Sequence, residues 1–587
     1  MSITPRGMSV QESYRLYRDN KLIVNRKYQR KLVWTCAEKE HLIDSIIKDY
    51  PIPLILLAEI NEDGSTFYEI IDGMQRLNAI FSFIENEYSI DDKYFDIDQF
   101  SRAKLAYNNG VFDIQEGAEK LPSVVCADIL DYQLAVTIFP VVDGNSVTDI
   151  FGRINSGGRQ LSAQDKRQAG MIDDFSMLVR KLSSEIRGDD SNDQLPLASM
   201  PDISIDSNRS NLGYALKAEE IFWCKQGVLW AKQLRDSEDE EMVVDICASL
   251  LLNQPIARSK ELFDKIYDEN DEVYSTIRRN LNTYGIERLS TEIKVTLSVL
   301  KEVINEYDPS ANALRRIVNP TRNPIKASFY AIFMAFYRLV IEEEKTPEDI
   351  QGIMNALNGL QQQMNSSANY ATTEDRVKNI DKTVGLIQRF FVRSEPPLLN
   401  HGAGLALDVE NSLRRSRLET ARYECKQGIL NVDHDKKINN KVFEKLIHTI
   451  CAMVNIGPDS NGYFFFGVAD TLEDAQRISE IYSESYEQIG SRYIVGVDRE
   501  ASTLGISLEE YIDKIVHHIR KSELPDSLKT QVLAKIDIVE VRGKTIIRIN
   551  VPSQSEVCFV GDDAYIRDNT KTRIATPKEL VTISKLF

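Results

Sequence analysis

Two short stretches in the last third of the chain carry residues that could together bind and cleave a phosphodiester. Glu424 and Lys426 lie in residues 422–426, which alternate as a strand does, so both side chains project from one face. Asp470 follows the apolar run 463–468, which is typical of a buried strand. A carboxylate can hold a divalent cation, and a cation with a nearby lysine offsets charge that builds on a phosphate. Glu419, just ahead of the first strand, offers a third oxygen donor for Mg²⁺ or Mn²⁺.

The spacing of Glu424 and Lys426 alone also fits a solvated cross-strand ion pair. A family resemblance adds support to the catalytic interpretation. The order of the motifs resembles the core of the Schlafen family, the AlbA-like domain, from about residue 405 to the C-terminus. The matching residues are Glu419, Glu424 and Lys426, then Ala452-Met453-Val454-Asn455, Gly462-Tyr463 and Gly467-Val468-x-Asp470.

The Schlafen resemblance implies a metal-dependent nuclease that acts on DNA or RNA, with tRNA and modified phage DNA as candidate substrates. Glu419, Glu424 and Asp470 would be the metal-binding carboxylates, and Lys426 would stabilise the phosphate. Such domains often pair, so we expect a homo-oligomer, in the simplest case a dimer.

Basic residues around these motifs are candidate contacts to nucleic acid. One group surrounds the first strand and the other lies near the C-terminus: Arg414, Arg415, Arg417 and Arg422, then Arg567, Lys571 and Arg573. A solvated helix face explains the first group equally well, and structural pairing with Asp562 or Asp568 explains the second.

The elements around the motifs have an α/β pattern. Residues 508–519 place Ile512, Ile515 and Ile519 on one face of a helix. Two β-rich runs, 536–541 and 545–551, flank Arg542-Gly543-Lys544 and predict a hairpin.

A second candidate site lies near the N-terminus, where a strand at 67–71 runs into Asp72-Gly73-Met74-Gln75-Arg76 and the period becomes helical. Free N–H groups at a helix start favour phosphate, and Arg76 adds further donors. Alternatively, Asp72 caps the helix and Arg76 pairs with a carboxylate. A loop with Arg153, Asn155 and Gly157-Gly158 is a further place where backbone could approach a ligand.

These segments resemble the N-terminal domain of GmrSD-type restriction proteins, a ParB/sulfiredoxin-like fold. The match rests on Tyr28-Gln29-Arg30 with Trp34, Pro51-Ile52-Pro53, the Asp72–Arg76 motif, and Phe151-x-Arg153-x-Asn155. The resemblance implies a nucleoside triphosphate site that includes Arg30, Asp72, Gly73, Gln75, Arg76, Arg153 and Asn155. Met74 replaces a glutamine of the family signature, so hydrolysis and simple binding both stay open.

The remaining sequence predicts a multidomain α+β protein. We expect a ParB/sulfiredoxin-like α/β domain at 1–170, a helical extension at 171–395, a linker at 396–404 and a Schlafen-like domain at 405–587. The longest apolar stretch, 329–341, is interrupted by Arg338 and predicts a core helix rather than a membrane span.

Charge and cysteine content narrow the function classes. The net charge is −18, of which −15 falls in the first 395 residues, so nucleic acid would need a local basic surface. The seven cysteines are scattered without a Cys-x-x-Cys pair, which argues against a zinc knuckle or disulfide scaffold. The N-terminus lacks the apolar core of a signal peptide, and we expect a cytoplasmic protein without membrane contact.

We therefore expect an antiviral, restriction-type protein in which a nucleotide- or modified-nucleic-acid-sensing domain controls a Schlafen-like nuclease. Two alternatives stay open. The chain could be a non-catalytic nucleic-acid-binding regulator, or an NTPase whose Schlafen-like part only docks or oligomerises.

Overall fold

The computed structural model describes most of the chain, and the predicted multidomain α+β class is confirmed. It covers residues 4–26, 29, 31–62, 64–114, 117–140, 162–168, 171–189, 193–201, 203–204, 216–365, 371–393, 409–410, 412–413, 416, 420–458, 460–568 and 571–587. The chain divides into two compact units, Met1–Leu399 and Asn400–Phe587. The expected linker 396–404 lies outside the described residues.

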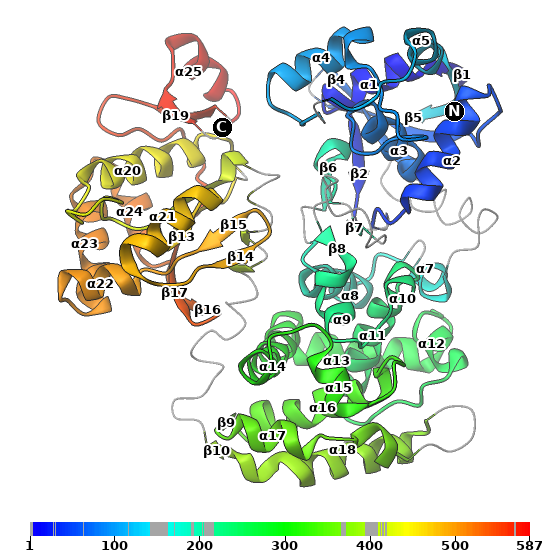
Figure 1. Ribbon diagram of the computed structural model, residues 1–587, viewed down its shortest axis with the longest axis vertical. Coiled ribbons are helices and arrows are strands. Elements are labelled where there is room, and N and C mark those ends of the chain that lie inside the picture. The colour runs from blue at the N-terminus through cyan, green and yellow to red at the C-terminus, as the bar shows by residue number, and fades with distance from the viewer. Residues whose placement is uncertain are drawn as a thin grey trace. The chain divides into compact units, whose positions relative to one another are not determined.

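The first unit begins with a six-stranded mixed sheet of order β1-β5-β3-β4-β2-β6 (Figure 1). Central strands β3 and β4 form an antiparallel pair, while β3 runs parallel to β5 and β4 runs parallel to β2. The strands are β1 (Thr4–Ser9), β2 (Leu22–Asn25), β3 (Ile55–Glu62), β4 (Ser65–Asp72), β5 (Gln133–Pro140) and β6 (Gln194–Pro196). The helices beside them are α1 (Val10–Arg18), α2 (Cys36–Ile47), α3 (Met74–Ile84), α4 (Ser101–Asn108) and α5 (Ser123–Asp131).

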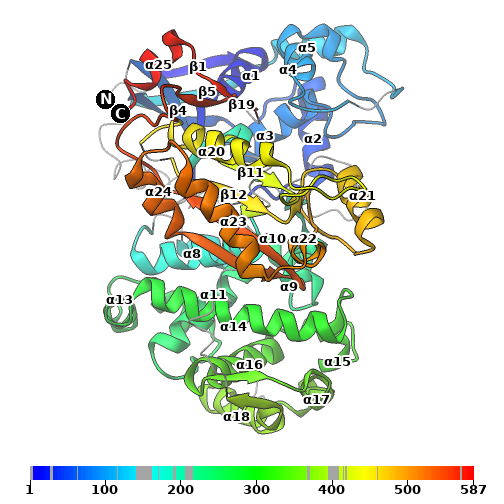
Figure 2. The ribbon, with the colours of Figure 1, turned by 90° about the vertical axis from the view of Figure 1, so that its left-hand side faces the viewer.

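Helices make up most of the rest of the first unit. Helices α14, α16 and α18 form successive layers (Figure 2). Helix α16 is apolar all round because both of its faces are buried, which is the predicted core helix. The helices are α7 (Ala163–Gln168), α8 (Asp174–Arg187), α9 (Phe222–Lys225), α10 (Ala231–Arg235), α11 (Glu238–Leu251), α12 (Lys260–Ile266), α13 (Glu272–Tyr284), α14 (Ile286–Tyr307), α15 (Ala313–Val318), α16 (Lys326–Tyr337), α17 (Ile350–Ala356) and α18 (Thr373–Ile387). Two short pairs, β7 (Ile203–Ser204) with β8 (Leu216–Lys217) and β9 (Lys345–Pro347) with β10 (Phe391–Arg393), accompany them.

The second unit is an α/β domain with a four-stranded sheet of order β11-β12-β17-β16 and a three-stranded sheet of order β13-β15-β14. Its strands are β11 (Tyr423–Lys426), β12 (Gly462–Phe466), β13 (Val468–Ala469), β14 (Glu487–Ile489), β15 (Arg492–Ile494), β16 (Ile536–Val541), β17 (Lys544–Val551), β18 (Tyr565–Asp568) and β19 (Lys571–Ile574). Its helices are α20 (Asn440–Val454), α21 (Leu472–Tyr482), α22 (Asp498–Leu504), α23 (Leu508–Lys521), α24 (Asp526–Leu533) and α25 (Pro577–Ile583).

The core of the second unit explains why β12 is continuously apolar. Phe464 and Phe466 pack in one hydrophobic cluster with α20 and α23, while Phe465 packs in another on the opposite face. A strand covered on both sides has no reason to alternate with polar residues. The predicted helix at 508–519 and the predicted hairpin at 536–551 are both confirmed, as α23 and as β16–β17.

Two negative findings concern the described residues alone. Among them, we find no helix with the length and apolar character that a bilayer crossing needs. All seven cysteines are described, and each is a free thiol.

Candidate active site

Strand β11 places Glu424 and Lys426 beside the bend that leads to Asp470. β11 runs parallel to β12, and the backbone N–H of Gly467 donates to the Lys426 carbonyl at 2.9 Å. Gly467 has a φ of 94°, and a Cβ there would lie 2.9 Å from the Thr545 carbonyl oxygen. The bend between β12 and β13 therefore requires glycine.

The Glu424 carboxylate is buried and bound by three cations. Its Oε1 lies 2.8 Å from Nζ of Lys426 and 2.8 Å from Nζ of Lys445, which comes from α20. Its Oε2 lies 2.9 Å from the guanidinium of Arg567 on β18. The side chain is only 7% exposed, so these partners replace most of its hydration.

The charges around Glu424 keep it ionised. Burial alone would raise the pKa of this carboxyl, but Lys426 and Lys445 outweigh burial and hold the pKa at about 2. Burial works against the charge of Lys426 as well, yet the adjacent Glu424 raises the pKa of the ammonium overall. Both groups are therefore charged at neutral pH.

Asp470 follows β13 and shares this electrostatic environment. Burial raises its pKa, against the opposing charges of Arg492 and Lys426, and the charge of Glu424 raises it further. Its carboxylate pairs with Arg492 of β15, whose Nε also donates to Ser416 Oγ at 2.8 Å. Asp470 is about half exposed, at 47% of its side chain, so it is the more accessible of the two carboxylates.

Arg567 ties the β18–β19 hairpin to β11. Besides Glu424, it donates to the carbonyls of Ala421 at 3.2 Å and Tyr423 at 3.1 Å and to Thr572 Oγ1 at 3.0 Å. Its side chain is 1% exposed. It therefore holds Glu424 in place from inside the domain and offers no surface to a ligand in this structure.

The loop after β11 is fixed by a buried carboxylate, Glu500. Its Oε2 accepts from the backbone N–H of Ile429 at 2.7 Å, from that of Leu430 at 3.2 Å and from the Tyr511 hydroxyl at 2.7 Å. This network fixes the backbone at Ile429 and Leu430, shortly after the end of β11.

The N-terminal candidate site is a tight turn between β4 and α3. Gly73 precedes the helix with a φ of 103° and makes no side-chain cap, so the first turn of α3 has no capping side chain. Asp72 accepts from the Gly73 N–H at 2.8 Å, and Arg76 pairs with Asp72 at 2.8 Å and donates to the Leu54 carbonyl at 3.1 Å. Nε of Arg76 is buried and has no hydrogen-bond partner among the described residues.

The side chain of Gln75 is hydrogen-bonded to the backbone of residues 31–34 and does not face an open site. Its Oε1 accepts from the backbone N–H of Val33 and of Trp34, both at 3.2 Å, and its Nε2 donates to the Lys31 carbonyl at 2.9 Å. Gln29 behaves similarly and donates to the carbonyls of Ile70 and Ile71. Gln29 therefore fastens the loop that follows β2 to the end of β4, and Gln75 fastens it to the start of α3.

Comparison with known protein families finds one match in the N-terminal part of the chain and one in the C-terminal part. Residues 13–172 match the family model of the GmrSD restriction endonuclease, N-terminal domain, and residues 419–576 match Schlafen, AlbA_2. The chain carries both of these domains. No curated protein matches the chain, and no solved structure does. Together, the two domains support a restriction- or defence-type protein that acts on nucleic acid.

Within the Schlafen AlbA_2 domain, the structure brings Glu424, Lys426 and Asp470 into one neighbourhood. Glu419, Arg414, Arg415 and Arg417 lie outside the described residues. In the described part of the chain, no three His, Cys, Asp or Glu side chains gather as a metal site would require.

The remaining basic residues predicted for nucleic acid differ in their surroundings. Arg422 is half-buried and Lys571 is exposed, and neither has an ion pair with a described residue. Arg573 pairs with Asp568 at 3.4 Å and Glu579 at 2.7 Å, as the structural alternative predicts. Arg567 pairs with Glu424 instead of with either predicted aspartate.

In the GmrSD N-terminal domain, the structure places Asp72, Gly73 and Arg76 together at the turn. Arg76 pairs with a carboxylate, as the structural alternative held, but Gly73 and not Asp72 occupies the cap position. Arg30, Arg153 and Asn155 lie outside the described residues.

Two cations of the C-terminal site were not anticipated from the sequence. Lys445 projects from a helix that is otherwise recognisable by its apolar face, and Arg492 comes from a short strand. The only sequence signal for Lys445 is its place on the polar face of α20 with Lys441, one helical turn before it.

Proposed function

We propose that the Schlafen AlbA_2 domain binds the phosphate backbone of DNA or RNA at the Glu424 site and cleaves it, within a restriction-type antiviral protein. The observation that carries this proposal is the pairing of Lys426 and Lys445 with one oxygen of Glu424. Two ammonium groups fixed side by side make a preformed place for a phosphate.

The excess of cationic side chains around Glu424 favours the binding of an anion. Two carboxylates, Glu424 and Asp470, stand among four cations: Lys426, Lys445, Arg492 and Arg567. Local positive charge of this kind attracts a polyanion even though the whole chain carries −18. Arg422 and Lys571 are available to extend the contact along the backbone.

The donor chemistry also suits Mg²⁺ or Mn²⁺. Glu424 and Asp470 present carboxylate oxygens, the ligands that these hard cations prefer, and Glu419 is the third candidate ligand. When bound, such an ion would activate the nucleophile and stabilise charge on the phosphate. In the structure, the ammonium groups of Lys426 and Lys445 both lie on Oε1 of Glu424, so an ion held by this carboxylate would compete with them.

Lys426 would contribute positive charge to the cleavage, and Arg567 would position Glu424. Lys426 would neutralise the non-bridging phosphate oxygens, since the Cys425 carbonyl and Glu424 hold its ammonium in place. Arg567 would keep Glu424 oriented, because its guanidinium bonds that carboxylate and the β11 backbone together.

For the GmrSD N-terminal domain we propose a nucleoside triphosphate site at the Gly73 turn. The uncapped start of α3 and the unpartnered Nε of Arg76 support an anion there. Because Gln75 is fully engaged with the 31–34 loop, it would support the site indirectly.

The main competing function is a regulator that binds nucleic acid and does not cut it. The saturation of Glu424 by three cations favours this alternative. Incubating the full chain with tRNA, single-stranded DNA and duplex DNA, with Mn²⁺ or EDTA and with or without GTP, separates the two. Mn²⁺-dependent products support the nuclease, whereas binding without products in every condition leaves only the regulator.

A further inference from the structure

Two stacked rings lie beside the cations of the Glu424 site. His448 of α20 stacks on Tyr565 of β18, with ring centroids 4.0 Å apart and ring planes at 9°. Helix α20 and the β18–β19 hairpin pack against each other and lie side by side in both Figure 1 and Figure 2. Tyr565 packs against the apolar core of the unit, whereas His448 lies on the polar face of α20 with Lys441 and Lys445. His448 is therefore the ring of the pair that a ligand can reach.

Two elements fix the position of these rings relative to the site. On α20, Lys445 precedes His448 by three residues, so the two side chains are neighbours on one face of the helix. On β18, Tyr565 and Arg567 are two residues apart and project from the same face of the strand. Lys445 and Arg567 both bind the Glu424 carboxylate. The ring pair therefore lies next to the proposed phosphate site.

The surroundings of His448 suit a base better than a second phosphate. Burial lowers the pKa of the imidazole, against the opposing charges of Glu444 and Asp563, so the ring is uncharged at neutral pH. Glu444 and Asp563 are both exposed and would repel a phosphate. The same carboxylates can accept hydrogen bonds from the amino groups of a base, and the ring offers a flat aromatic face.

The polar atoms of the two rings are free to bond a ligand. In the described part of the chain, neither the imidazole of His448 nor the hydroxyl of Tyr565 has a hydrogen-bond partner. Both side chains are only half-buried, so water satisfies these atoms in the absence of a ligand.

We infer that His448 and Tyr565 form a stacking platform for one unpaired base of the nucleic acid whose phosphate binds at Lys426 and Lys445. Successive turns of an α-helix are about 5.4 Å apart, so one nucleotide can reach both Lys445 and His448. A base inside a duplex is already stacked on its neighbours, and only an unpaired base can lie on a protein ring. The inference rests on the proposed phosphate site and adds the class of substrate, a single-stranded segment.

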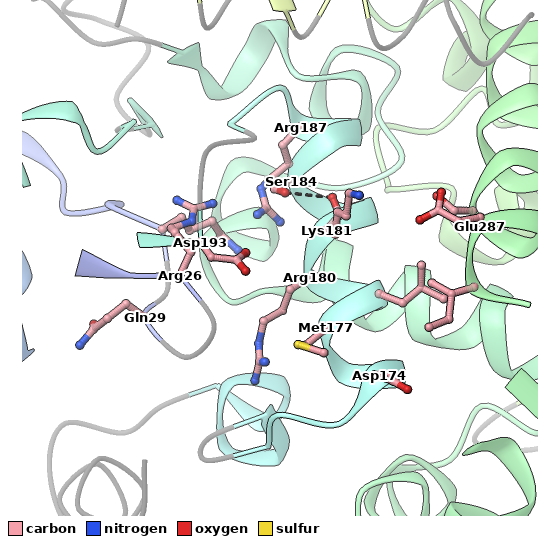
Figure 3. Close-up of a pocket in the computed structure, with 14 residues that line it drawn as sticks. Arg26, Gln29, Asp174, Met177, Arg180, Lys181, Ser184, Arg187, Asp193 and Glu287 are labelled. Atoms are coloured by element: carbon pink, nitrogen blue, oxygen red, sulfur yellow. Dashed lines mark hydrogen bonds between the residues drawn. The ribbon is translucent and has the colours of Figure 1, made fainter. Parts of the chain in front are cut away.

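The cavity of about 330 Å³ in the first unit has no comparable feature (Figure 3). None of the described residues that line it is aromatic. Its exposed acidic residues Asp174, Asp193 and Glu287 stand in the same lining as the exposed Lys181, so charges of both signs share the wall. Lys181 therefore serves as a charge-reversal control in the other unit of the chain.

The test compares the binding of two labelled strands to the full chain in EDTA, where metal-dependent cleavage is suppressed. One is a short single-stranded oligonucleotide, and the other is its abasic counterpart with the same phosphates. We expect the wild type to bind the base-containing strand about tenfold more tightly, which is the contribution of one stacked base. His448→Ala should remove most of this preference, and His448→Phe, which keeps an aromatic ring, should retain it.

Three controls separate the platform from the rest of the protein. His434→Ala, a change of an exposed histidine in the second unit, should bind both strands as the wild type does. Lys445→Glu should weaken both strands to a similar degree because it reverses a phosphate contact, and Lys181→Glu should weaken neither. A wild-type crosslink, which needs no variant to fold, is the second readout. A 5-iodouracil base in the strand should crosslink on irradiation to the peptides that contain His448 or Tyr565.

Three results would overturn the inference: a wild type without preference for the base-containing strand, a preference that His448→Ala leaves intact, and crosslinks at neither ring. The proposed phosphate site still stands in each case if Lys445→Glu weakens both strands. If the wild type binds neither strand, or Lys445→Glu binds both as the wild type does, the proposed function fails and the platform inference fails with it.

Discussion

Nζ of Lys445 lies 2.8 Å from Oε1 of Glu424, on the same oxygen that Lys426 binds. A divalent cation that uses this oxygen must compete with the Lys445 ammonium. Replacing Lys445 with methionine keeps the length of the side chain and removes the competing charge. We predict that Lys445→Met binds Mn²⁺ several-fold more tightly than wild type, as measured by electron paramagnetic resonance or calorimetry.

The matched control for this prediction is Lys441→Met, one turn earlier on α20 and exposed. It should leave Mn²⁺ affinity unchanged. Equal or weaker Mn²⁺ binding by Lys445→Met would show that the ion does not use this oxygen.

The stability of the second unit should depend on pH through Glu424. Its pKa is lowered from 4.5 to about 2 in the folded protein, so the unfolded chain binds more protons between these values and stability falls as pH falls through them. The free energy of unfolding of the wild type should exceed that of Glu424→Gln by up to about 3 kcal/mol at neutral pH. The difference should shrink as the pH falls from about 5 toward 2 and vanish only below pH 2.

Urea unfolding in EDTA across that pH range measures this difference. Glu444→Gln, an exposed change on α20, is the control and should not follow the same course. A gap between wild type and Glu424→Gln that stays constant with pH would contradict the electrostatic account.

Arg567 should be indispensable to the geometry of the site. Breaking a buried ion pair by removing one partner typically costs about 3–5 kcal/mol. Arg567→Lys should be nearly as harmful as Arg567→Ala, because one ammonium cannot replace a fork that bonds Glu424, Ala421, Tyr423 and Thr572.

Hydrogen exchange over residues 565–574 reports on the hairpin directly. Faster exchange there in Arg567→Lys is the expected result, with Arg573→Lys as an exposed control. Native-like exchange in Arg567→Lys would assign the stability of the hairpin to other contacts, such as the stacking of His448 on Tyr565.

Sequence patterns predicted helices and strands well where the burial of apolar side chains determines the pattern. Continuous apolar residues marked β12, and the change of period after Asp72 marked the start of α3. The surroundings of individual polar side chains were harder to predict. The pairing of Lys445 with Glu424 depends on how α20 packs across the sheet, and the burial of Arg567 depends on where the β18–β19 hairpin folds back. Neither relationship leaves a local signal in the sequence.

In the N-terminal motif, the hydrogen-bond partners of Gln75 were likewise not predictable from the sequence. These hydrogen bonds give a prediction for Gln75. Removing its side chain leaves the N–H groups of Val33 and Trp34 and the carbonyl of Lys31 without their partner. Gln75→Ala should therefore destabilise the first unit by about 1–3 kcal/mol. Gln75→Glu can still accept both N–H groups and should retain part of the stability in chemical unfolding. Full stability of Gln75→Ala would argue that the glutamine serves a ligand instead.

The central claim is that Glu424 and its lysines form a nuclease site. Its most direct test is single-turnover cleavage of labelled RNA and DNA at saturating Mn²⁺ by wild type, Glu424→Gln and the control Glu444→Gln. The account predicts that Glu424→Gln loses roughly 10²-fold or more in rate while it still binds the nucleic acid, and that Glu444→Gln is unaffected. Cleavage by Glu424→Gln at the wild-type rate, or cleavage that persists in EDTA, would contradict it.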